Sequence, residues 1–421
     1  MIVASHSSLL IWGIAALAVL GVIARPWRLP EAIWAAMGAV LLVVSGLIPW
    51  RAALGAVGKG TDVYLFLVGM MLLAELARRE GLFDTVAALA VGWARGSATR
   101  LFALVYAVGV VVTVFLSNDA TAVVLTPAVY AAARAAKAEP LPYLFICAFV
   151  ANAASFVLPI SNPANLVLFG SHMPPLTVWL ARFALPSLLA IGATYFALRL
   201  TQGAGLKQDL ARDIPVPSLR RGGWLALAGI VTTALVLLTA SAYGADLGLP
   251  TFVAGGLTAL VVLVYRRQGA VQLLHGISWS VLPLVAGLFV LVEGLNLTGV
   301  TGALAAGLAH WAAQSQPSAG FGSGIAVALV CNLVNNLPAG LIAGAAAGQA
   351  ALPGTMTGAL LIGVDLGPNL SVTGSLATIL WLLALRREGE SVGFWRFLKV
   401  GAVVMPPALL LALGALFAAV S

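Results

Sequence analysis

Ser117-Asn118-Asp119 and Asn335-Asn336-Leu337-Pro338 are two polar breaks in apolar sequence, and the second follows the first by about half of the chain. Asn and Asp usually form turns among other polar residues, but these breaks lie beside stretches such as Val-Phe-Leu and Ala-Val-Val-Leu. The pattern predicts two polar tips buried in a membrane, as in transporters built from two inverted repeats. The alternative is short helices joined by Asn-rich turns in water.

The composition is typical of a multi-pass membrane protein. Of the 421 residues, 61% are hydrophobic and 9% are charged, and the apolar runs repeatedly reach the roughly 20 residues that a membrane-spanning helix needs. Long runs of Ala, Leu and Val satisfy their backbone hydrogen bonds as helices rather than as barrel strands. The predicted fold class is therefore an all-α polytopic membrane protein, located in the inner (plasma) membrane of the cell.

The positive charges indicate orientation in the membrane. The net charge is +8, but Lys and Arg lie in short loops and form no basic stripe, so no nucleic-acid partner is expected. Loops rich in these residues face the cytoplasm, which predicts about ten crossings and both termini outside. The expected spans are 8–24, 30–49, 62–78, 142–169, 176–198, 222–241, 250–266, 278–296, 356–384 and 398–419. The cation-poor loops placed outside include 170–175, 242–250, 297–320 and 350–355.

Equal spacing indicates an internal repeat. Gly69, Glu75 and Gly81 recur as Gly287, Glu293 and Gly299 at one constant offset along the chain, and the same offset relates the two polar breaks. We expect an N-terminal repeat at 1–200, a cytoplasmic linker at 201–221 and a C-terminal repeat at 222–421. Each half holds an odd number of predicted crossings, so the second copy should enter the membrane from the opposite side.

Each repeat is predicted to contain a re-entrant hairpin and a broken helix. The stretches at about 101–133 and 320–349 are short for two full crossings and a turn, so a hairpin with a buried tip fits better. The next apolar segments, at about 142–169 and 356–384, are interrupted by Pro, Asn and Ser, and in the second case also by Gly. Pro removes a helical donor and Gly weakens a helix, so both segments should unwind near mid-membrane.

The two tips and the two unwound helices are expected to enclose one cavity. Its amides and hydroxyls carry no charge but donate and accept hydrogen bonds, which suits a small neutral polyhydroxylated solute better than a dicarboxylate. Helix-end amides could still hold an anion, and a purely structural role between helices is the alternative. The candidate substrate-binding residues are Asn118, Ser161, Asn162, Asn165, Asn335, Asn336, Asn369, Ser371 and Thr373.

Asp119 and Asp365 are the candidate proton-coupling residues. Both lie in the breaks, where a charged carboxylate costs roughly 2.5 to 3.5 kcal/mol on insertion scales. A carboxyl there can bind and release a proton as the site changes sides. The alternative is that each carboxylate stays ionised and caps a helix.

No catalytic residue, metal site or cofactor is expected. Cys147 and Cys331 lie in apolar sequence without CxxC spacing, and the four histidines are scattered, so neither a disulfide framework nor a metal site is indicated. No nucleophile and base occur in a recognisable arrangement, so the chain is predicted to be a transporter rather than an enzyme.

Four stretches carry a resemblance to a known family. They are Phe115-Leu116-Ser117-Asn118-Asp119, Ser161-Asn162 with Asn165, Asn332-Leu333-Val334-Asn335-Asn336-Leu337-Pro338, and Gly363-Val364-Asp365-Leu366-Gly367-Pro368-Asn369 through Gly374-Ser375-Leu376-Ala377-Thr378. In these stretches, and over nearly its whole length, the chain resembles the arsenite/antimonite efflux permeases, the ArsB family of the ion transporter superfamily.

The resemblance implies a scaffold domain, a moving transport domain built around the two hairpins, and export of trivalent arsenic or antimony as the neutral hydroxide in exchange for protons. It also implies that a soluble arsenite-stimulated ATPase is a possible partner; this chain has no Walker A sequence of its own. Two departures are Ala120, where relatives often have Gly, and Asn369, where some have Lys. The alternatives are a sodium- or proton-coupled exchanger of organic anions or cations, and a passive metalloid channel subunit driven by a partner ATPase.

Overall fold

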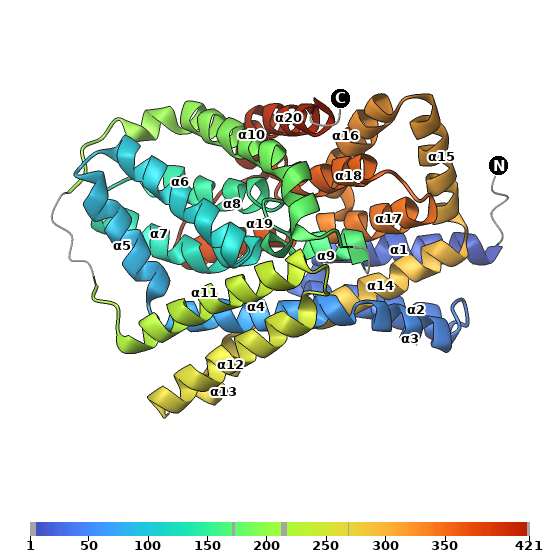
Figure 1. Cartoon of the computed structure of the whole chain (residues 1–421), viewed down its shortest axis with the longest axis horizontal. Coiled ribbons are helices and arrows are strands. Elements are labelled where there is room, and N and C mark those ends of the chain that lie inside the picture. Colours follow the sequence, from blue (N-terminus) through green and yellow to red (C-terminus); the bar gives the residue numbers. More distant parts are fainter. Residues whose placement is uncertain (1–5, 171–172, 212–216, 268, 419–421) are drawn as a thin grey trace.

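The computed structural model describes residues 6–170, 173–211, 217–267 and 269–418, and it confirms the all-α fold class (Figure 1). Residues 212–216 of the predicted linker lie outside these ranges. Within the described ranges the only β-type pairing is an isolated bridge between Ser97 and Asp209.

The first half of the chain, before the linker, is a series of helices. They are α1 (His6–Ala24), α2 (Glu31–Val44), α3 (Trp50–Lys59), α4 (Thr61–Arg79), α5 (Leu82–Ala94), α6 (Ala98–Phe115), the π-helix η2 (Ala120–Leu125), α7 (Thr126–Ala135), α8 (Leu141–Ala153), η3 (Pro159–Ser161), α9 (Pro163–Phe169) and α10 (Leu176–Gln202).

The second half of the chain continues with a similar order of elements. They are α11 (Arg221–Ala242), α12 (Gly248–Arg266), α13 (Ala270–Gly276), α14 (Val281–Leu297), α15 (Val300–Gln314), α16 (Gln316–Val334), α17 (Asn336–Gln349), α18 (Gly354–Leu366), η6 (Gly367–Asn369), α19 (Leu376–Arg387) and α20 (Phe394–Ala418). The first residues of three pairs of helices, α5 and α15, α6 and α16, and α10 and α20, are separated by the same offset as Gly69 and Gly287. The spacing that relates the polar breaks in the sequence therefore also relates these helix starts.

The structure contains enough apolar helix for a multi-pass membrane protein. Within the described residues, seven helices are long and apolar enough to cross a membrane, and the number rises to nine when the bent pairs α3/α4 and α13/α14 are each counted as one span. All ten predicted spans fall on helices, but two of them are the broken pairs α8/α9 and α18/α19, and one is the 14-residue α2. The helices α6 and α16 are among the seven that are long and apolar enough to cross a membrane, although they form the first arms of the predicted hairpins.

The sequence predicts no helix between the span that ends at 78 and the hairpin that begins at about 101, and it predicts a loop at 297–320; both predictions are wrong. Residues 82–94 form α5 and residues 300–314 form α15. Helices of this length extend about 20 Å, less than the roughly 30 Å of a hydrocarbon core, so neither stands out as a membrane span. Arginines on both sides of α5 added to the appearance of a loop.

Helices from the two halves pack against each other in a reciprocal way. α4 of the first half lies along α12 of the second, and α14 of the second half lies along α2 of the first. In Figure 1, α1 to α4 and α11 to α14 form the lower part of the molecule, and most of the remaining helices lie above them. α10 and α20 pack together along the top of the same view.

Two glycines permit these helices to approach closely. A Cβ on Gly69 of α4 would collide with the backbone of Thr251 in α12, and a Cβ on Gly287 of α14 would lie 2.6 Å from the backbone carbon of Ala35 in α2. Atoms this close cannot be accommodated without moving a whole helix. The two glycines are one of the pairs that the constant offset relates in the sequence, so the reciprocal packing uses glycines at equivalent positions.

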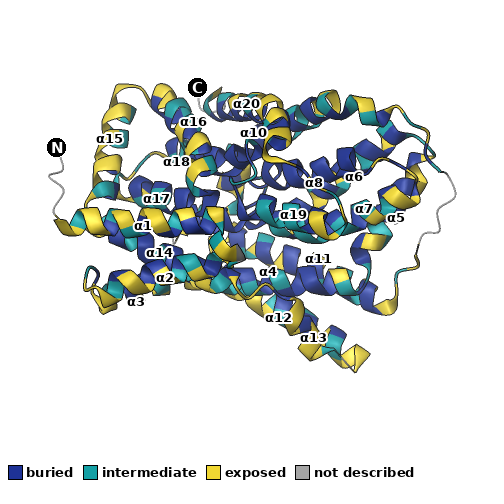
Figure 2. Cartoon of the chain, turned by 180° about the vertical axis from the view of Figure 1, so that it is seen from behind, coloured by how far each residue is buried: buried dark blue, intermediate teal, exposed yellow. Residues whose placement is uncertain are grey.

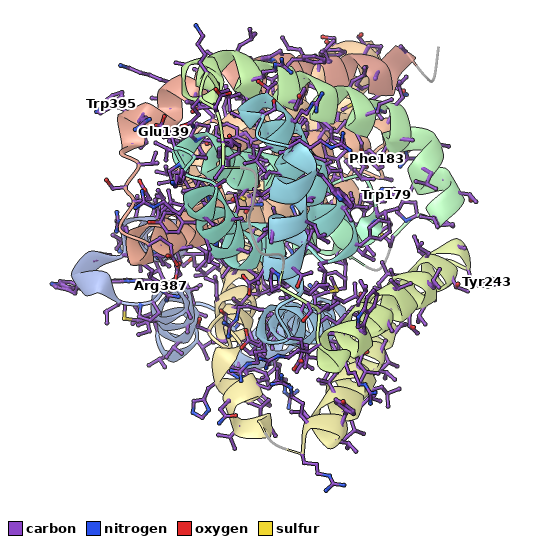
Figure 3. The ribbon with its side chains drawn as sticks, turned by 90° about the vertical axis from the view of Figure 1, so that its left-hand side faces the viewer. Glu139, Trp179, Phe183, Tyr243, Arg387 and Trp395 are labelled. Carbon is purple, nitrogen blue, oxygen red and sulfur yellow. The ribbon has the colours of Figure 1, made fainter. Side chains whose placement is uncertain are left out.

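The broken helices lie in the centre of the molecule. Every residue of α8 (Figure 2) and of α9 is buried, and α18 is buried from Gly358 to its end at Leu366. A helix that is apolar on all sides is expected to be surrounded by protein or lipid, and here protein surrounds it. Large side chains at helix ends instead point outward, as Tyr243 and Trp395 do in Figure 3. Aromatic residues at such positions favour the surface of a membrane.

Gly69→Ala is expected to lower the melting temperature of the detergent-solubilised protein, because the new Cβ would push α12 away from α4. Gly13→Ala is the matched control: its Cβ meets nothing within 4 Å, and Ala is favoured over Gly inside a helix by about 0.5–1 kcal/mol. The control should melt at or above the wild-type temperature. Equal melting temperatures for both variants would contradict the close contact of α4 with α12.

Candidate functional site

The first hairpin turns at Leu116 and Ser117, between the end of α6 and a returning arm that starts at Asn118. The Ser117 hydroxyl accepts a hydrogen bond from the backbone of Ala120 at 3.2 Å, and the Asn118 side chain accepts one from the backbone of Asp119 at 2.9 Å. The arm continues as the π-helix η2, a geometry common at functional sites. Local side-chain bonds therefore define the tip that carries Asn118 and Asp119.

The second hairpin turns at Asn335, which has a positive φ of 74°. Its side-chain oxygen accepts a hydrogen bond from Leu337 N at 3.3 Å, and its amide donates to Thr373 O at 3.3 Å. The backbone of Asn336 donates to Gly374 O at 2.9 Å. The second tip is thus bonded to the break between α18 and α19.

Hydroxyls from the two broken helices bind the first arm of each hairpin, which is α6 in the first and α16 in the second. Ser161 donates to Val114 O in α6 at 3.1 Å. Ser371 donates to the Asn332 side chain and Thr373 to the Asn332 backbone in α16, each at 2.8 Å. Val114 and Asn332 are related by the same offset as the two polar breaks. The hydroxyls of the two breaks therefore bind equivalent positions of α6 and α16.

Two further predicted site residues hold the unwound segments together. The Asn165 amide donates to the carbonyls of Ser155 and Pro159 at 2.9 and 3.2 Å. The Asn369 amide donates to Phe149 O at 3.1 Å, and its oxygen accepts from Asn152 at 3.0 Å. Both side chains are fully buried. Some of the predicted site residues make such bonds and do not line the cavity described below. They are Ser161, Asn165, Asn335, Asn369, Ser371 and Thr373.

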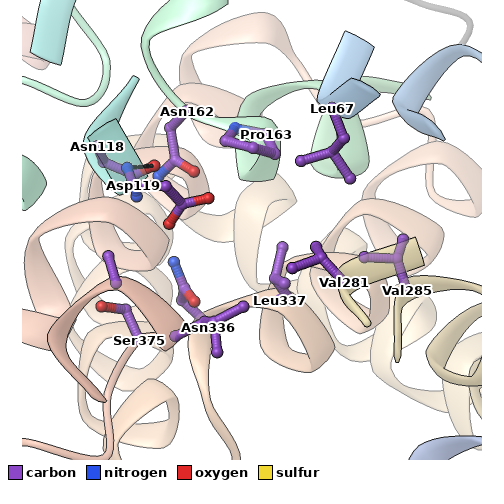
Figure 4. Close-up of a pocket in the computed structure, with 12 residues that line it drawn as sticks. Leu67, Asn118, Asp119, Asn162, Pro163, Val281, Val285, Asn336, Leu337 and Ser375 are labelled. Atoms are coloured by element: carbon purple, nitrogen blue, oxygen red, sulfur yellow. Dashed lines mark hydrogen bonds between the residues drawn. The ribbon is translucent and has the colours of Figure 1, made fainter. Parts of the chain in front are cut away.

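Four of the predicted residues do come together around one small cavity (Figure 4). The polar side chains that line it are Asn118, Asp119, Asn162, Asn336 and Ser375, and the apolar part of the wall consists of Leu67, Pro163, Val281, Val285, Leu337, Leu376 and Ala377. The cavity has a volume of about 20 Å³, which is room for roughly one water molecule. No Lys or Arg occurs among these described lining residues.

Asp365 lies behind the cavity wall and is linked to it by Asn162. The Asn162 amide donates to Asp365 Oδ1 at 2.8 Å, and its own oxygen accepts from Ala164 N at 3.0 Å. The second bond fixes which end of the amide faces the carboxyl. Asp365 is fully buried, and its other oxygen has no hydrogen-bond partner among the described residues. Asn162 therefore connects a buried carboxyl with the cavity that holds Asp119.

Four helical segments begin at the cavity. The returning arm of the first hairpin starts at Asn118, α17 at Asn336, α9 after its cap Asn162 and α19 after its cap Ser375. Helix starts carry unpaired N–H groups and the positive end of the helix dipole. The positive ends of these segments therefore face the cavity that Asp119 lines, and no cationic side chain occurs among its described lining residues.

A larger cavity, which we call the vestibule, adjoins the small one. Its volume is about 580 Å³, and it is lined by Gly58, Lys59, Asp62, Val63, residues 166–170, Asp246, Phe289, Val292, Glu293, Asn296, Leu341, Gly344, Ala345, Gly348 and Gln349. Four helices line both spaces, since α4, α9, α14 and α17 contribute Leu67, Pro163, Val285 and Leu337 to the small cavity and continue into the vestibule. Lys59 forms an ion pair with Glu293 there at 2.8 Å.

Sequence reasoning did not identify all of the lining residues. Ser375 lies in one of the four stretches that carry the family resemblance, but it is not among the predicted site residues. Leu67, Val281 and Val285 come from α4 and α14, which contain no polar interruption at those positions. Apolar residues in apolar helices give no local signal, so only the packing of these helices against the hairpins reveals their role.

Comparison with known proteins supports the resemblance. The arsenical pump membrane protein of Escherichia coli K12 is 27% identical over 410 residues, covering 91% of this chain and 92% of that protein. Its counterpart from Yersinia enterocolitica is 26% identical over 368 residues, covering 83% and 84%. The crystal structure of the YdaH transporter of Alcanivorax borkumensis aligns with a TM-score of 0.60 at 17% identity and covers 98% of each chain, which shows a shared fold.

The family assignment follows from a match to most of the chain. The model of the citrate transporter family matches residues 11–368. The expected similarity to arsenite/antimonite permeases is confirmed by the arsenical pump relatives, and the multi-pass membrane location is confirmed by the apolar helices. This protein is a membrane transporter that belongs to the citrate transporter family.

Proposed function

We propose that the protein exports arsenite or antimonite, as the neutral trihydroxide, in exchange for protons. The observation that carries the proposal is the chemistry of the small cavity, in which amides, a hydroxyl and one carboxyl converge without a Lys or Arg among the described lining residues. Such groups donate to and accept from hydroxyls, whereas a citrate trianion would meet Asp119 without a cationic side chain to offset its charge.

The present cavity is too small for the cargo, and this favours a closed state of the transporter. A space of about 20 Å³ holds roughly one water molecule, while a trihydroxide contains four non-hydrogen atoms. Widening requires that the hairpin tips separate from α4 and α14. We infer that the two hairpins and the two broken helices move as one transport domain against a scaffold that includes these two helices.

Asp365 and Asp119 provide the proposed proton-coupling groups. An ionised Asp365 would be held by one amide and have no cation beside it, which is costly for a charge inside a membrane. A proton removes that charge and alters the bond to Asn162, which also lines the cavity. Proton binding at Asp365 and substrate binding at Asn162 would then influence each other through one shared amide.

The relatives and the topology give further support. The matched proteins from Escherichia coli and Yersinia enterocolitica are named arsenical pump membrane proteins, which favours an arsenical substrate. The vestibule is lined by residues of the loops predicted to lie outside, among them Gly170 and Asp246. We propose that it is the exit path, that the two halves are inverted repeats, and that a partner ATPase is dispensable for exchange.

An organic anion is the second candidate substrate. It is favoured by the match to the citrate transporter family and by the four helix starts around the cavity, because helix N-termini bind anions without cationic side chains. Citrate and arsenite can be compared in the same preparation, so the two candidates are separable.

Arsenite flux into proteoliposomes that contain only this protein is expected to follow an imposed pH gradient and to fall to the passive rate when the gradient is collapsed. Antimonite should behave in the same way, and citrate should not be transported. Citrate flux in place of arsenite flux would support the organic-anion function. Flux of arsenite that ignores the gradient would indicate a passive channel.

Asp365→Asn is expected to abolish the gradient dependence of transport, because the amide cannot bind and release the proton that Asp365 carries. Asp119→Asn, tested in parallel, should reduce gradient-driven flux at least about tenfold, which corresponds to a loss of 1.4 kcal/mol. Asp84→Asn is the matched control, since Asp84 is exposed in the first turn of α5. Full coupling in both site variants would rule out these carboxyls as proton carriers.

Removing both cysteines is expected to leave transport intact, because Cys147 and Cys331 are buried away from the small cavity.

In the variant without cysteines, Ala345→Cys in the vestibule should react with a membrane-impermeant maleimide added outside the cell. Gln272→Cys, near the predicted cytoplasmic end of α4, is the control and should react only from the inside. The opposite pattern of labelling would reverse the proposed exit path.

A further inference from the structure

A third cavity, which we call the basic cavity, lies at the other end of α4 from the vestibule. Its volume is about 400 Å³. It is lined by Leu76, Arg79, Glu80, Arg220, Val262, Leu263, Arg266, Gly269, Gln272 and Leu273. These residues come from α4, α12, α13 and the segment that precedes α11, and none of them belongs to the proposed transport site.

The basic cavity has more positive than negative charge. Glu75 bonds both Arg78 and Arg79, at 2.7 and 2.6 Å, and Glu80 pairs with Arg266 at 2.9 Å. Arg220 has no ion-pair partner among the described residues. Three guanidinium groups, those of Arg79, Arg220 and Arg266, line the cavity together with one carboxylate, that of Glu80. The surplus of cations predicts an anionic ligand.

The position of the basic cavity is that of a membrane surface. α4 ends at Arg79, α12 ends at Arg266 and α11 begins at Arg221, so the arginines mark the level at which three long apolar helices stop. Trp224, in the first turn of α11, is 61% exposed, and exposed indoles favour the same level.

The lower wall of the cavity is apolar. Leu76, Val262 and Leu273 belong to a cluster of buried hydrophobic residues beneath the arginines. Along α12, Leu257, Leu260 and Val264 are exposed, so an apolar path continues from the cavity down the outside of the helix. A ligand with an anionic head and hydrocarbon chains matches both parts of this surface.

We propose that the basic cavity binds the phosphate headgroup of an anionic phospholipid. Guanidinium groups bind phosphate oxygens through paired, charge-assisted hydrogen bonds, and basic pockets between helices on the cytoplasmic side are suited to phospholipid heads. A free phosphate ion shares the head chemistry but would leave the apolar path unused. The bound lipid would join the ends of α4, α11 and α12.

The test is native mass spectrometry of the full-length protein in detergent, titrated with dioleoylphosphatidylglycerol and, separately, with dioleoylphosphatidylcholine. The anionic lipid should bind the wild type more tightly. Arg220→Gln should weaken binding of the anionic lipid about fivefold, as expected when one arginine near a phosphate is lost, and should leave binding of the zwitterionic lipid unchanged. Arg220 makes no ion pair among the described residues, so its replacement should leave the melting temperature unaltered.

Arg387→Gln is the matched control, because Arg387 is an exposed arginine at the end of α19, outside the basic cavity. It should bind the anionic lipid as the wild type does. Equal affinities of Arg220→Gln and the wild type would overturn the proposal, and so would equal binding of both lipids by the wild type. Displacement of the anionic lipid by an equal concentration of sodium phosphate would also overturn it, in favour of a site for the free ion.

Discussion

A broken helix can exist inside a hydrocarbon layer only when protein groups satisfy the backbone N–H and C=O groups that the break leaves free. The structure meets this constraint with the side chains of the breaks themselves. Asn165 bonds the carbonyls of its own unwound segment, Asn369 bonds α8, and Ser161 bonds α6. Because these bonds are made, the breaks can lie in the most deeply buried part of the molecule, and the helices that start from them can point at one cavity.

The amides therefore have two different tasks. Asn165, Asn335 and Asn369 bond the unwound segments. Asn118, Asn162 and Asn336 reach the cavity. Asn162 does both, since its oxygen caps α9 while its amide holds Asp365. Asn162 thus connects the local fold, a buried carboxyl and the cavity surface, and the proposed coupling of proton and substrate binding rests on this connection.

The helix α4 relates the three cavities to one another. Asp62 lines the vestibule, Leu67 lines the small cavity and Arg79 lines the basic cavity, so Leu67 lies about 9 Å along the helix from its first residue and about 18 Å from its last. Gly69 holds the same helix against α12. Within α4 itself, Asp62 lies at the vestibule end, residues 63–74 carry no charge, and Glu75, Arg78 and Arg79 lie at the other end, as expected for a helix that passes through a membrane.

The sequence by itself determined the helical class, the approximate spans, the positions of the four breaks and the constant spacing between the two halves, because these follow from composition, from the length of apolar runs and from the effects of Pro, Gly and Asn on a helix. It also placed Asn118, Asp119, Asn162 and Asn336 in one site. Only the tertiary structure decided which other amides face the cavity, that Asp365 reaches it through Asn162, and that Leu67 and Val285 complete the wall. A break in a helix can be recognised from the sequence, since it depends on neighbours in the chain. The direction of each polar side chain depends instead on its hydrogen-bond partner. Packing decides which carbonyl, carboxyl or amide comes within roughly 3 Å of it.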